Sequence, residues 1–397
     1  MSSASQSQYP AKSQRYSGPP TIARFEDKVM VPGGINQPKR VACIGSNGKV
    51  YKQLVKGNDD LRQDAGLMHV FSVTDALLAR HAPTRQRKLG IRTYKVVPLA
   101  PQAGLLEWVD HTIPLVNVYA QQFDKRPVIN GVKQLKAADA RAMLGRISTQ
   151  SRRSKYMMMR DQILPKFQPV FRHWFLAQPD AETWFRKRLA YSRSCAASSI
   201  IGWVVGLGDR HTSNILFDEK TAELVHIDLG ISFDAGKALP IPETVPFRLT
   251  QNMVDGLGPS GLDGVFRRCC QETYRVLRAE APVLYTILEV FKADPLHSWS
   301  DPQKLARAAH RGGDEGGSGG EPALRTSRAA AASASHGGGS GGSAASSENN
   351  EAARALRGVR RKLEARETVE CKVNELIQDA TSVENLAQIF CGWMPFV

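Results

Sequence analysis

The chain has 397 residues, of which 42% are hydrophobic and 23% are charged, so it can bury at least one large core and is expected to form two lobes. Its apolar run from Ile200 to Leu207 includes two glycines and falls far short of the ~20 residues that cross a bilayer, so no transmembrane helix is predicted. The N-terminus has neither the basic nor the apolar segment of a secretory signal, which argues against secretion.

Cysteine spacing indicates the cellular compartment of the protein, and net charge indicates which partners it favours. The six cysteines include no C-x-x-C pair, and the adjacent Cys269 and Cys270 are poorly placed to bond each other, so reduced thiols in the nucleus or cytoplasm are expected. The formal charge of +15 favours phosphate-rich partners, but the basic residues are scattered along the chain. The positive charge is therefore compatible with direct binding to DNA and also with a basic surface that contacts only solvent.

Residues 1–22 are rich in Ser, Gln and Pro, and we predict a disordered tail there. Too few apolar groups are present to offset an ordering cost of ~1 to 2 kcal/mol per residue. The tail contains Ser5, Ser7 and Ser13, each followed by Gln.

Residues 23–110 are predicted to form short strands joined by turns. The expected strands are Lys28–Val31, Arg40–Ile44, Val50–Lys56, Ile91–Leu99 and Gly104–Val109. The stretch from Gly45 to Gly48 is typical of a tight hairpin turn. Gly33 and Gly34, directly after Pro32, would let the backbone approach a phosphate closely, although ordinary turns need such a pair as often.

Lys56 closes one of these strands and is followed by an acidic helix start. Its ammonium group is a candidate phosphate anchor, held by a carboxylate such as Asp64, although most lysines are simply solvated. In a two-lobed nucleotide enzyme the strand Gly104–Val109 would lead into the hinge, with Tyr94 and Trp108 beside the adenine. Packing of both aromatic rings in the core is an equal alternative.

Residues 111–300 are predicted to be mostly helical and to carry a crowded polar loop. A helix of small residues over Ala190–Val205 leads into Gly206-Leu-Gly-Asp-Arg-His-Thr-Ser-Asn214. Asp209, His211 and Asn214 fall within this loop, and polar side chains so crowded seldom serve a core. The alternative is a surface loop in which Asp and His cap turns.

Two β-prone runs follow the loop, Ile215–Phe217 and Glu223–Ile227, and the residues between them predict a hairpin. A hairpin would bring Asn214 at its entrance and Asp228 at its exit onto neighbouring strands, roughly 5 Å apart at the backbone. Two oxygen ligands so placed suit Mg²⁺, which usually takes one or two protein groups and completes its shell with water and phosphate oxygens. The pattern therefore predicts a metal-nucleotide site.

Phosphoryl transfer needs metal ions on the phosphates, a residue that orients the attacking hydroxyl, and positive charge near the transferred group. Asn214 and Asp228 are candidates for the first role, Asp209 for the second and His211 for the third. A catalytically inactive scaffold or nucleic-acid-binding fragment is the alternative of another class, disfavoured because Lys56, Asp209, Asn214 and Asp228 are all present.

The end of the chain changes in composition. Residues 301–350 are rich in Gly, Ser and Ala and predict a flexible linker. A helix is expected over residues 351–365, and a helical module over residues 366–397 with a capping box at Thr381-Ser-Val-Glu384. Its apolar ending is typical of a segment packed against a partner or the body of the fold.

The loop Gly206–Asn214 together with His226-Ile-Asp-Leu-Gly230 resembles the catalytic and activation-loop signatures of the phosphatidylinositol 3-kinase-related protein kinases. Gln53-Leu-Val-Lys-Gly57, Asp60-Leu-Arg-Gln-Asp64, Pro242-Glu-Thr-Val-Pro-Phe-Arg-Leu-Thr250 and Gly264-Val-Phe-Arg-Arg-Cys-Cys270 are most similar to the ATM (ataxia telangiectasia mutated) branch. The resemblance implies an α+β, two-lobed kinase-like fold of the PI3K/PI4K type. It assigns a β-rich N-lobe to residues 23–110, a helical C-lobe to 111–300 with catalytic loop 206–214 and activation loop 226–250, and a FATC domain to 366–397.

The resemblance also implies roles for single residues. ATP would be bound with its phosphates at Lys56, with Asp64 near it, under a loop formed by residues 32–39. The adenine would be enclosed by Leu54, Tyr94, Trp108, Leu216 and Ile227, with the hinge backbone after Glu107. Asp209 and His211 would act on the hydroxyl and the transferred phosphate, with the proton acceptor undecided between them. Asn214 and Asp228 would hold Mg²⁺, with Mn²⁺ as a second candidate ion.

The implied activity is Ser/Thr protein phosphorylation, at sites followed by Gln, in nuclear DNA-damage, DNA-repair and telomere signalling. A lipid kinase is the alternative, but the segment from Asp228 to Val245 offers only Lys237 to a phosphoinositide headgroup. Regulatory proteins are expected at the FATC end, and an oligomer stays open. Family members carry FAT and helical-repeat regions before the kinase, so this chain is expected to be a fragment or one piece of a split protein.

Overall fold

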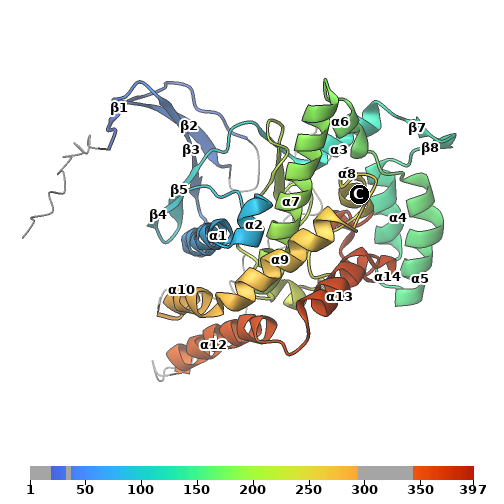
Figure 1. Cartoon of the computed structure of the whole chain (residues 1–397). Coiled ribbons are helices and arrows are strands. Elements are labelled where there is room, and N and C mark those ends of the chain that lie inside the picture. The colour runs from blue at the N-terminus through green and yellow to red at the C-terminus, as the bar shows by residue number, and fades with distance from the viewer. Residues whose placement is uncertain (1–18, 33–36, 294–342) are drawn as a thin grey trace, which may run out of the picture.

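The computed structural model describes residues 19–32, 37–293 and 343–397. A small sheet-rich part formed by the first third of the chain lies beside a larger helical part (Figure 1). Ser5, Ser7 and Ser13 lie outside the described residues, as do Gly33 and Gly34 and most of the predicted linker.

The N-terminal part is one antiparallel sheet of five strands in the order β1-β2-β3-β5-β4. Its strands are β1 (Ile22–Phe25), β2 (Lys39–Gly45), β3 (Val50–Gly57), β4 (Val96–Ala100) and β5 (Ala103–Glu107). The predicted hairpin between β2 and β3 is confirmed, with the Gly48 N–H donating to the Gly45 carbonyl at 2.9 Å. Helix α1 (Arg62–Arg80) packs against β4, and α2 (Ala82–Gln86) follows it.

Two predicted strands were wrong in extent. Within Lys28–Val31 only Met30 pairs, in an isolated bridge to Arg40. The strand predicted over Ile91–Leu99 begins only at Val96. The Ile91 N–H donates to the Asp75 carboxylate at 2.8 Å instead of to a neighbouring strand, so a side chain of α1 takes over the backbone bond that the β-prone residues suggested.

The helical part is organised around α7 (Ala181–Val205). Asp180 caps its start by accepting from the Thr183 N–H at 2.7 Å, and Ala196, Ala197 and Ser198 on its buried side allow close packing against α9. Tyr191 in the middle of this helix packs with three other aromatic rings, edge-to-face with Phe171 and Phe217 and tilted with Phe175. This packing anchors the helix that leads into the polar loop.

The middle of the chain contains further helices and strands. They are β6 (Thr112–Pro114), α3 (Leu115–Asp124), β7 (Val128–Ile129), β8 (Val132–Lys133), α4 (Ala137–Arg146), α5 (Arg152–Met157), α6 (Arg172–Leu176), β9 (Ile215–Asp218), β10 (Leu224–His226), α8 (Gln251–Gly256), α9 (Val265–Ala279) and α10 (Ala281–Ala293). Of these, α6, α8, α9 and β10 contact α7. β10, β9 and β6 form a second, three-stranded sheet. Within the described ranges, no helix has the length and apolar character needed to cross a membrane.

Of the C-terminal helices, α12 (Ser343–Leu363) runs beside α10 and α13 (Val369–Thr381) beside α9, while α14 (Val383–Leu386) lies by α5 (Figure 1). The helix expected from residue 351 begins earlier, at Ser343. The predicted capping box is displaced by one residue, because Thr381 ends α13 and Ser382 is the residue that caps α14, accepting from the Asn385 N–H at 3.3 Å.

Arg248 fastens the chain end to the helical part. Its buried guanidinium donates to the carbonyls of Trp393 at 2.7 Å, Met394 at 2.8 Å and Val397 at 3.0 Å, and stacks 4.3 Å from the centre of the Trp393 ring. Burial lowers the pKa of Arg248 to about 10, so the group stays charged at neutral pH. The apolar ending is therefore packed against the body of the fold, which was one of the two predicted positions; the other was contact with a partner.

Replacing Arg248 with Lys should lower the free energy of unfolding by about 3 kcal/mol, because a single ammonium group cannot reach the carbonyls that the planar guanidinium satisfies. Urea denaturation followed by tryptophan fluorescence measures this. Arg160→Lys is the matched control, since the Arg160 side chain is half exposed and contacts the nearby residues Asp161 and Tyr156. Equal midpoints for the two variants would contradict the role given to Arg248.

Candidate active site

The polar loop starts where α7 ends at Gly206, whose φ of 64° lies in the left-handed region that caps helices. Beyond it the loop pairs with the segment that follows Asp228. The Phe233 N–H donates to the Val205 carbonyl at 2.7 Å, and the Gly208 N–H donates to the Ile231 carbonyl at 2.9 Å. The two segments therefore hold each other in place.

Arg210 joins the loop to the hairpin. Its buried guanidinium donates to the carbonyls of Asn214 at 3.2 Å, Ile227 at 2.8 Å and Asp228 at 2.5 Å. Burial lowers the pKa of Arg210, and the charges of Asp209, Asp228 and Glu243 partly offset this. The Arg210 guanidinium thus fixes the backbone at both ends of the hairpin.

The predicted hairpin is confirmed as β9 and β10, with His226 opposite Ile215. Ile227 lies opposite Asn214 and donates its N–H to the Asn214 carbonyl at 3.1 Å, so Asp228 is one residue past the direct partner. Strand alternation alone would turn Asp228 to the other face, but Asp228 has a φ of 57° and leaves the extended conformation. The alternation therefore stops at Ile227.

Asp209, Asn214 and His211 meet at one carboxylate. The Asn214 amide nitrogen donates to the Asp209 carbonyl at 2.9 Å and to its Oδ2 at 3.3 Å. His211 Nε2 lies 3.9 Å from the same Oδ2. Asp209 has a left-handed φ of 56°, a conformation that a non-glycine residue keeps only when its surroundings enforce it.

The donor set fits a hard divalent cation. Because the Asn214 nitrogen is engaged by Asp209, the oxygen of its amide is the atom of that side chain suited to a cation, and the Asp228 carboxylate would be the second oxygen donor. One amide and one carboxylate are what Mg²⁺ usually takes from a protein. In the described part of the chain no three His, Cys, Asp or Glu side chains cluster as metal ligands, and this donor set does not require such a cluster.

Lys56 lies at the end of β3, next to Asp59, with Nζ 3.4 Å from Oδ2 of Asp59. Burial acts to lower the pKa of Lys56, but the charges of Asp228, Asp64 and Asp59 outweigh it, so the pKa lies above its usual value. The ammonium group is therefore charged and within the electrostatic reach of Asp228. The sequence suggested a carboxylate such as Asp64 as the partner of Lys56; Asp59 pairs with it, and the charge of Asp64 also acts on it.

Helix α1 of the N-terminal part holds the residues after Asp228. Asp64 accepts from the Leu229 N–H at 3.0 Å, and the buried Gln63 amide donates to the Gly230 carbonyl at 3.2 Å and to the Ser232 hydroxyl. Asp64 thus bridges the two parts of the molecule.

The five residues expected around the adenine are distributed over both parts. Leu54 on β3, Leu216 on β9 and Ile227 are partly buried and pack against the core, and the Trp108 N–H donates to the Lys52 carbonyl at 3.0 Å. Tyr94 is buried, and burial and the charges of Asp64 and Asp228 raise its pKa. Glu107 is exposed, as is Pro32 beside the undescribed Gly33 and Gly34.

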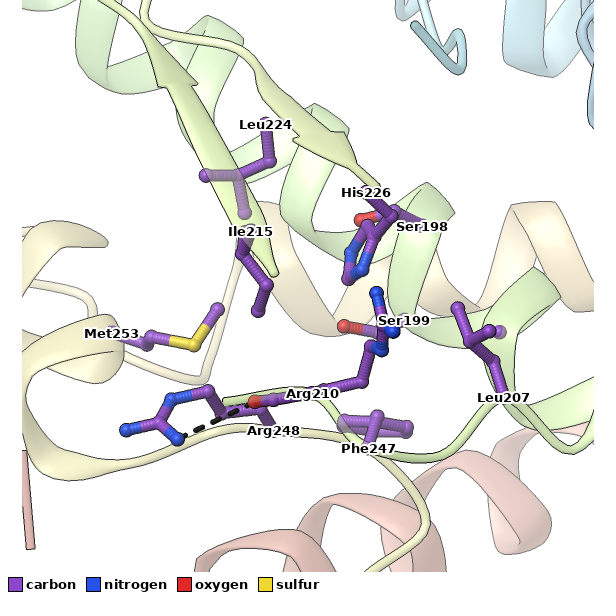
Figure 2. Close-up of a pocket in the computed structure, with 11 residues that line it drawn as sticks. Ser198, Ser199, Leu207, Arg210, Ile215, Leu224, His226, Phe247, Arg248 and Met253 are labelled. Atoms are coloured by element: carbon purple, nitrogen blue, oxygen red, sulfur yellow. Dashed lines mark hydrogen bonds between the residues drawn. The ribbon is translucent and has the colours of Figure 1, made fainter. Parts of the chain in front are cut away.

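A small internal cavity lies beside the loop (Figure 2). Its walls include Ser198 and Ser199 of α7, Arg210, His226 and Arg248. Burial, with the Arg210 charge, lowers the pKa of His226 to about 3, so the ring is neutral. None of its lining residues comes from the five-stranded sheet, so it is distinct from a nucleotide site between the two parts.

Sequence reasoning missed Gln63 and the function of Arg210. Both act on backbone carbonyls of distant segments, and no local pattern reports where those carbonyls will be. For Arg210, the one hint in the sequence was that a large charged side chain occurs in a short polar loop directly after an apolar helix.

Comparison with known proteins gives two family matches. The model described as phosphatidylinositol 3- and 4-kinase matches residues 50–301, and the FATC domain model matches residues 367–397. The chain is 43% identical over 384 residues to the serine/threonine-protein kinase tel1 of Neurospora crassa, and 41% identical over 384 residues to the serine-protein kinase ATM of Sus scrofa.

These alignments cover 96% and 95% of this chain but 13% and 12% of those proteins, so the chain spans about an eighth of their length. A solved structure, the FAT and kinase domain of CtTel1, superimposes with a TM-score of 0.81 at 40% identity. That likeness covers 99% of this chain and 25% of the other.

Proposed function

The chain belongs to the phosphatidylinositol 3- and 4-kinase family, and we propose from this and from the loop geometry that it is a Ser/Thr protein kinase. The predicted two-lobed kinase-like fold with a C-terminal FATC domain is confirmed. The observation that carries the proposal is the Arg210 clamp, which fixes the backbones of Asn214 and Asp228 while the Asn214 amide binds Asp209.

In the proposed reaction Asp209 accepts a hydrogen bond from the substrate hydroxyl and aims it at the γ-phosphate. Asn214 and Asp228 hold the divalent ion, for which we propose Mg²⁺ with Mn²⁺ as a substitute. When bound, Mg²⁺ and ATP supply the phosphoryl group and the charge that neutralises it. Lys56 contributes positive charge at the phosphates, and His211 adds polarity beside Asp209.

The nucleotide would lie between the two parts of the molecule. We propose that residues 32–39 cover the phosphates and that Leu54, Tyr94, Trp108, Leu216 and Ile227 enclose the adenine, with the hinge backbone after Glu107. The proposed division follows: N-lobe 23–110, C-lobe 111–300 and FATC 366–397. The bond from Asp64 to Leu229 would then couple the lobes at the site.

The choice of substrate rests on charge. Between Asp228 and Val245 the single basic residue is Lys237, whose ammonium lies 3.3 Å from the Asp234 carboxylate. A phosphoinositide headgroup needs clustered cations, so protein hydroxyls are favoured. We further propose Ser or Thr followed by Gln as the target, and a nuclear role in DNA-damage, repair and telomere signalling, since the relatives bear the names Tel1 and ATM.

A transfer assay tests this function. The full chain is incubated with radiolabelled ATP and Mg²⁺, and offered either a Ser-Gln peptide, the same peptide with Ala in place of Gln, or phosphatidylinositol vesicles. Label should enter the Ser-Gln peptide in preference to the other two. Label in the lipid alone would replace the proposal with a lipid kinase, and equal labelling of the two peptides would remove the Gln preference.

A further inference from the structure

Glu243 lies in the segment after Asp228, 34 residues beyond Asp209, yet it contacts the catalytic loop directly. Its Oε1 accepts a hydrogen bond from the Asp209 backbone N–H at 2.7 Å. Asp209 has a left-handed φ of 56°, which costs free energy unless the surroundings hold it. The Glu243 carboxylate is placed to do so, because it binds the backbone of the strained residue itself.

The other carboxylate oxygen is packed against backbone. A Cβ built on Gly208 would lie 2.7 Å from Oε2 of Glu243, and one built on Gly236 would lie closer still. Only glycine at these two positions lets the carboxylate approach. The Glu243 N–H also donates to the Gly236 carbonyl at 3.1 Å, so the side chain is wedged between the loop and its own segment.

Burial of this carboxylate raises the pKa of Glu243 to about 7, against the hydrogen bond from Asp209 and the charge of Arg210, which favour the ionised form. A buried carboxyl group is costly, and here it has a backbone N–H as its partner. The hydrogen bond from the Asp209 N–H thus offsets part of the cost of burying Glu243.

The C-terminal module fixes the residues that follow Glu243. The Thr244 hydroxyl donates to the carbonyl of Asn385 in α14 at 2.7 Å. Val245 packs against a small cluster made of Leu386, Ile389 and Trp393. The position of Glu243 is thus set from outside the loop that it supports.

We propose that Glu243 is a positioning residue that holds the Asp209 backbone in its left-handed conformation and so aims the Asp209 carboxylate at the acceptor hydroxyl. The inference deepens the proposed kinase function and rests on it. Its effect should appear in kcat and not in the KM for ATP, because Glu243 acts through Asp209 and does not reach the nucleotide-binding residues.

Two variants of matched volume test this in the full chain. Glu243→Gln keeps an oxygen that can accept from the Asp209 N–H, whereas Glu243→Met keeps the length of the side chain and removes the acceptor. We expect kcat to fall about 100-fold in the Met variant, since small misplacements of catalytic groups cost this much, and less than about tenfold in the Gln variant. Glu219→Gln, on the exposed turn of the β9–β10 hairpin, is the control and should match the wild type.

Amide hydrogen exchange of the peptide covering residues 206–214 gives a readout that needs no activity. Exchange should be faster in the Met variant than in the Gln variant or the wild type, with all three unfolding at similar temperatures. Equal loss of kcat in both variants, a change in KM for ATP alone, or unchanged exchange in the Met variant would overturn the proposal. A wild type that labels neither peptide nor lipid would refute the kinase function instead, and the exchange result would still decide whether Glu243 holds the loop.

Discussion

Replacing Asp209 with Asn should lower kcat for peptide phosphorylation by about 10²- to 10⁴-fold and leave the KM for ATP within about twofold. Asn has nearly the volume of Asp, so the loop should keep its shape. What disappears is the anionic oxygen, Oδ2, that the Asn214 amide and His211 approach from either side. Steady-state kinetics with the Ser-Gln peptide measure the split between kcat and KM.

The same geometry favours Asp209 over His211 as the proton acceptor of the proposed reaction. The Ser213 N–H donates to Nδ1 of His211 at 3.2 Å, so in the neutral ring the proton is on Nε2, the nitrogen that faces Asp209. That nitrogen cannot also take a proton from the hydroxyl. We therefore expect His211→Asn to cost less than Asp209→Asn, and a larger loss in the His211 variant would exchange the two roles.

Asp263→Asn is the control for a general effect of removing one negative charge. The Asp263 side chain is 80% exposed and pairs with Arg267 on α9. Its kcat should stay within about twofold of the wild type, because an exposed ion pair contributes little.

The hairpin shows what local sequence could predict. Two β-prone runs with a polar turn between them fixed the register closely enough to bring Asn214 and Asp228 to the same end, and the structure has this hairpin. The sequence could not predict that Asp228 would leave the extended conformation, because its left-handed φ is held by the Arg210 bond to its carbonyl. That contact depends on where α7 delivers the loop.

Tyr94 shows a limit of a different kind. Its surroundings in sequence are β-prone, yet Ile91 bonds to Asp75 of α1 and the strand begins after Tyr94. The ring is buried near the carboxylates of Asp64 and Asp228. Sequence alone could not tell whether Tyr94 belongs to the core or to the proposed site, because the buried ring packs in the core and also lies near Asp64 and Asp228.

Replacing Asp228 with Asn should lower kcat by about 10³-fold or more, since losing one anionic ligand of the divalent ion removes several kcal/mol of charge stabilisation. The variant should also lose much of the stabilisation that Mg²⁺ with ATP gives the wild type, about 2.7 kcal/mol at a hundredfold excess over Kd. Thermal unfolding with ATP, with and without Mg²⁺, measures this second effect independently of catalysis.

The Asp228 result also bears on Lys56. The Asp228 charge favours the protonated form of Lys56, so its loss leaves the ammonium group to Asp59 and Asp64. Binding of ATP without metal should therefore change little in Asp228→Asn, because the remaining two carboxylates still keep Lys56 charged. Equal activity of Asp228→Asn and wild type, or an unchanged Mg²⁺-dependent shift in unfolding, would show that the hairpin exit does not carry the metal ligand.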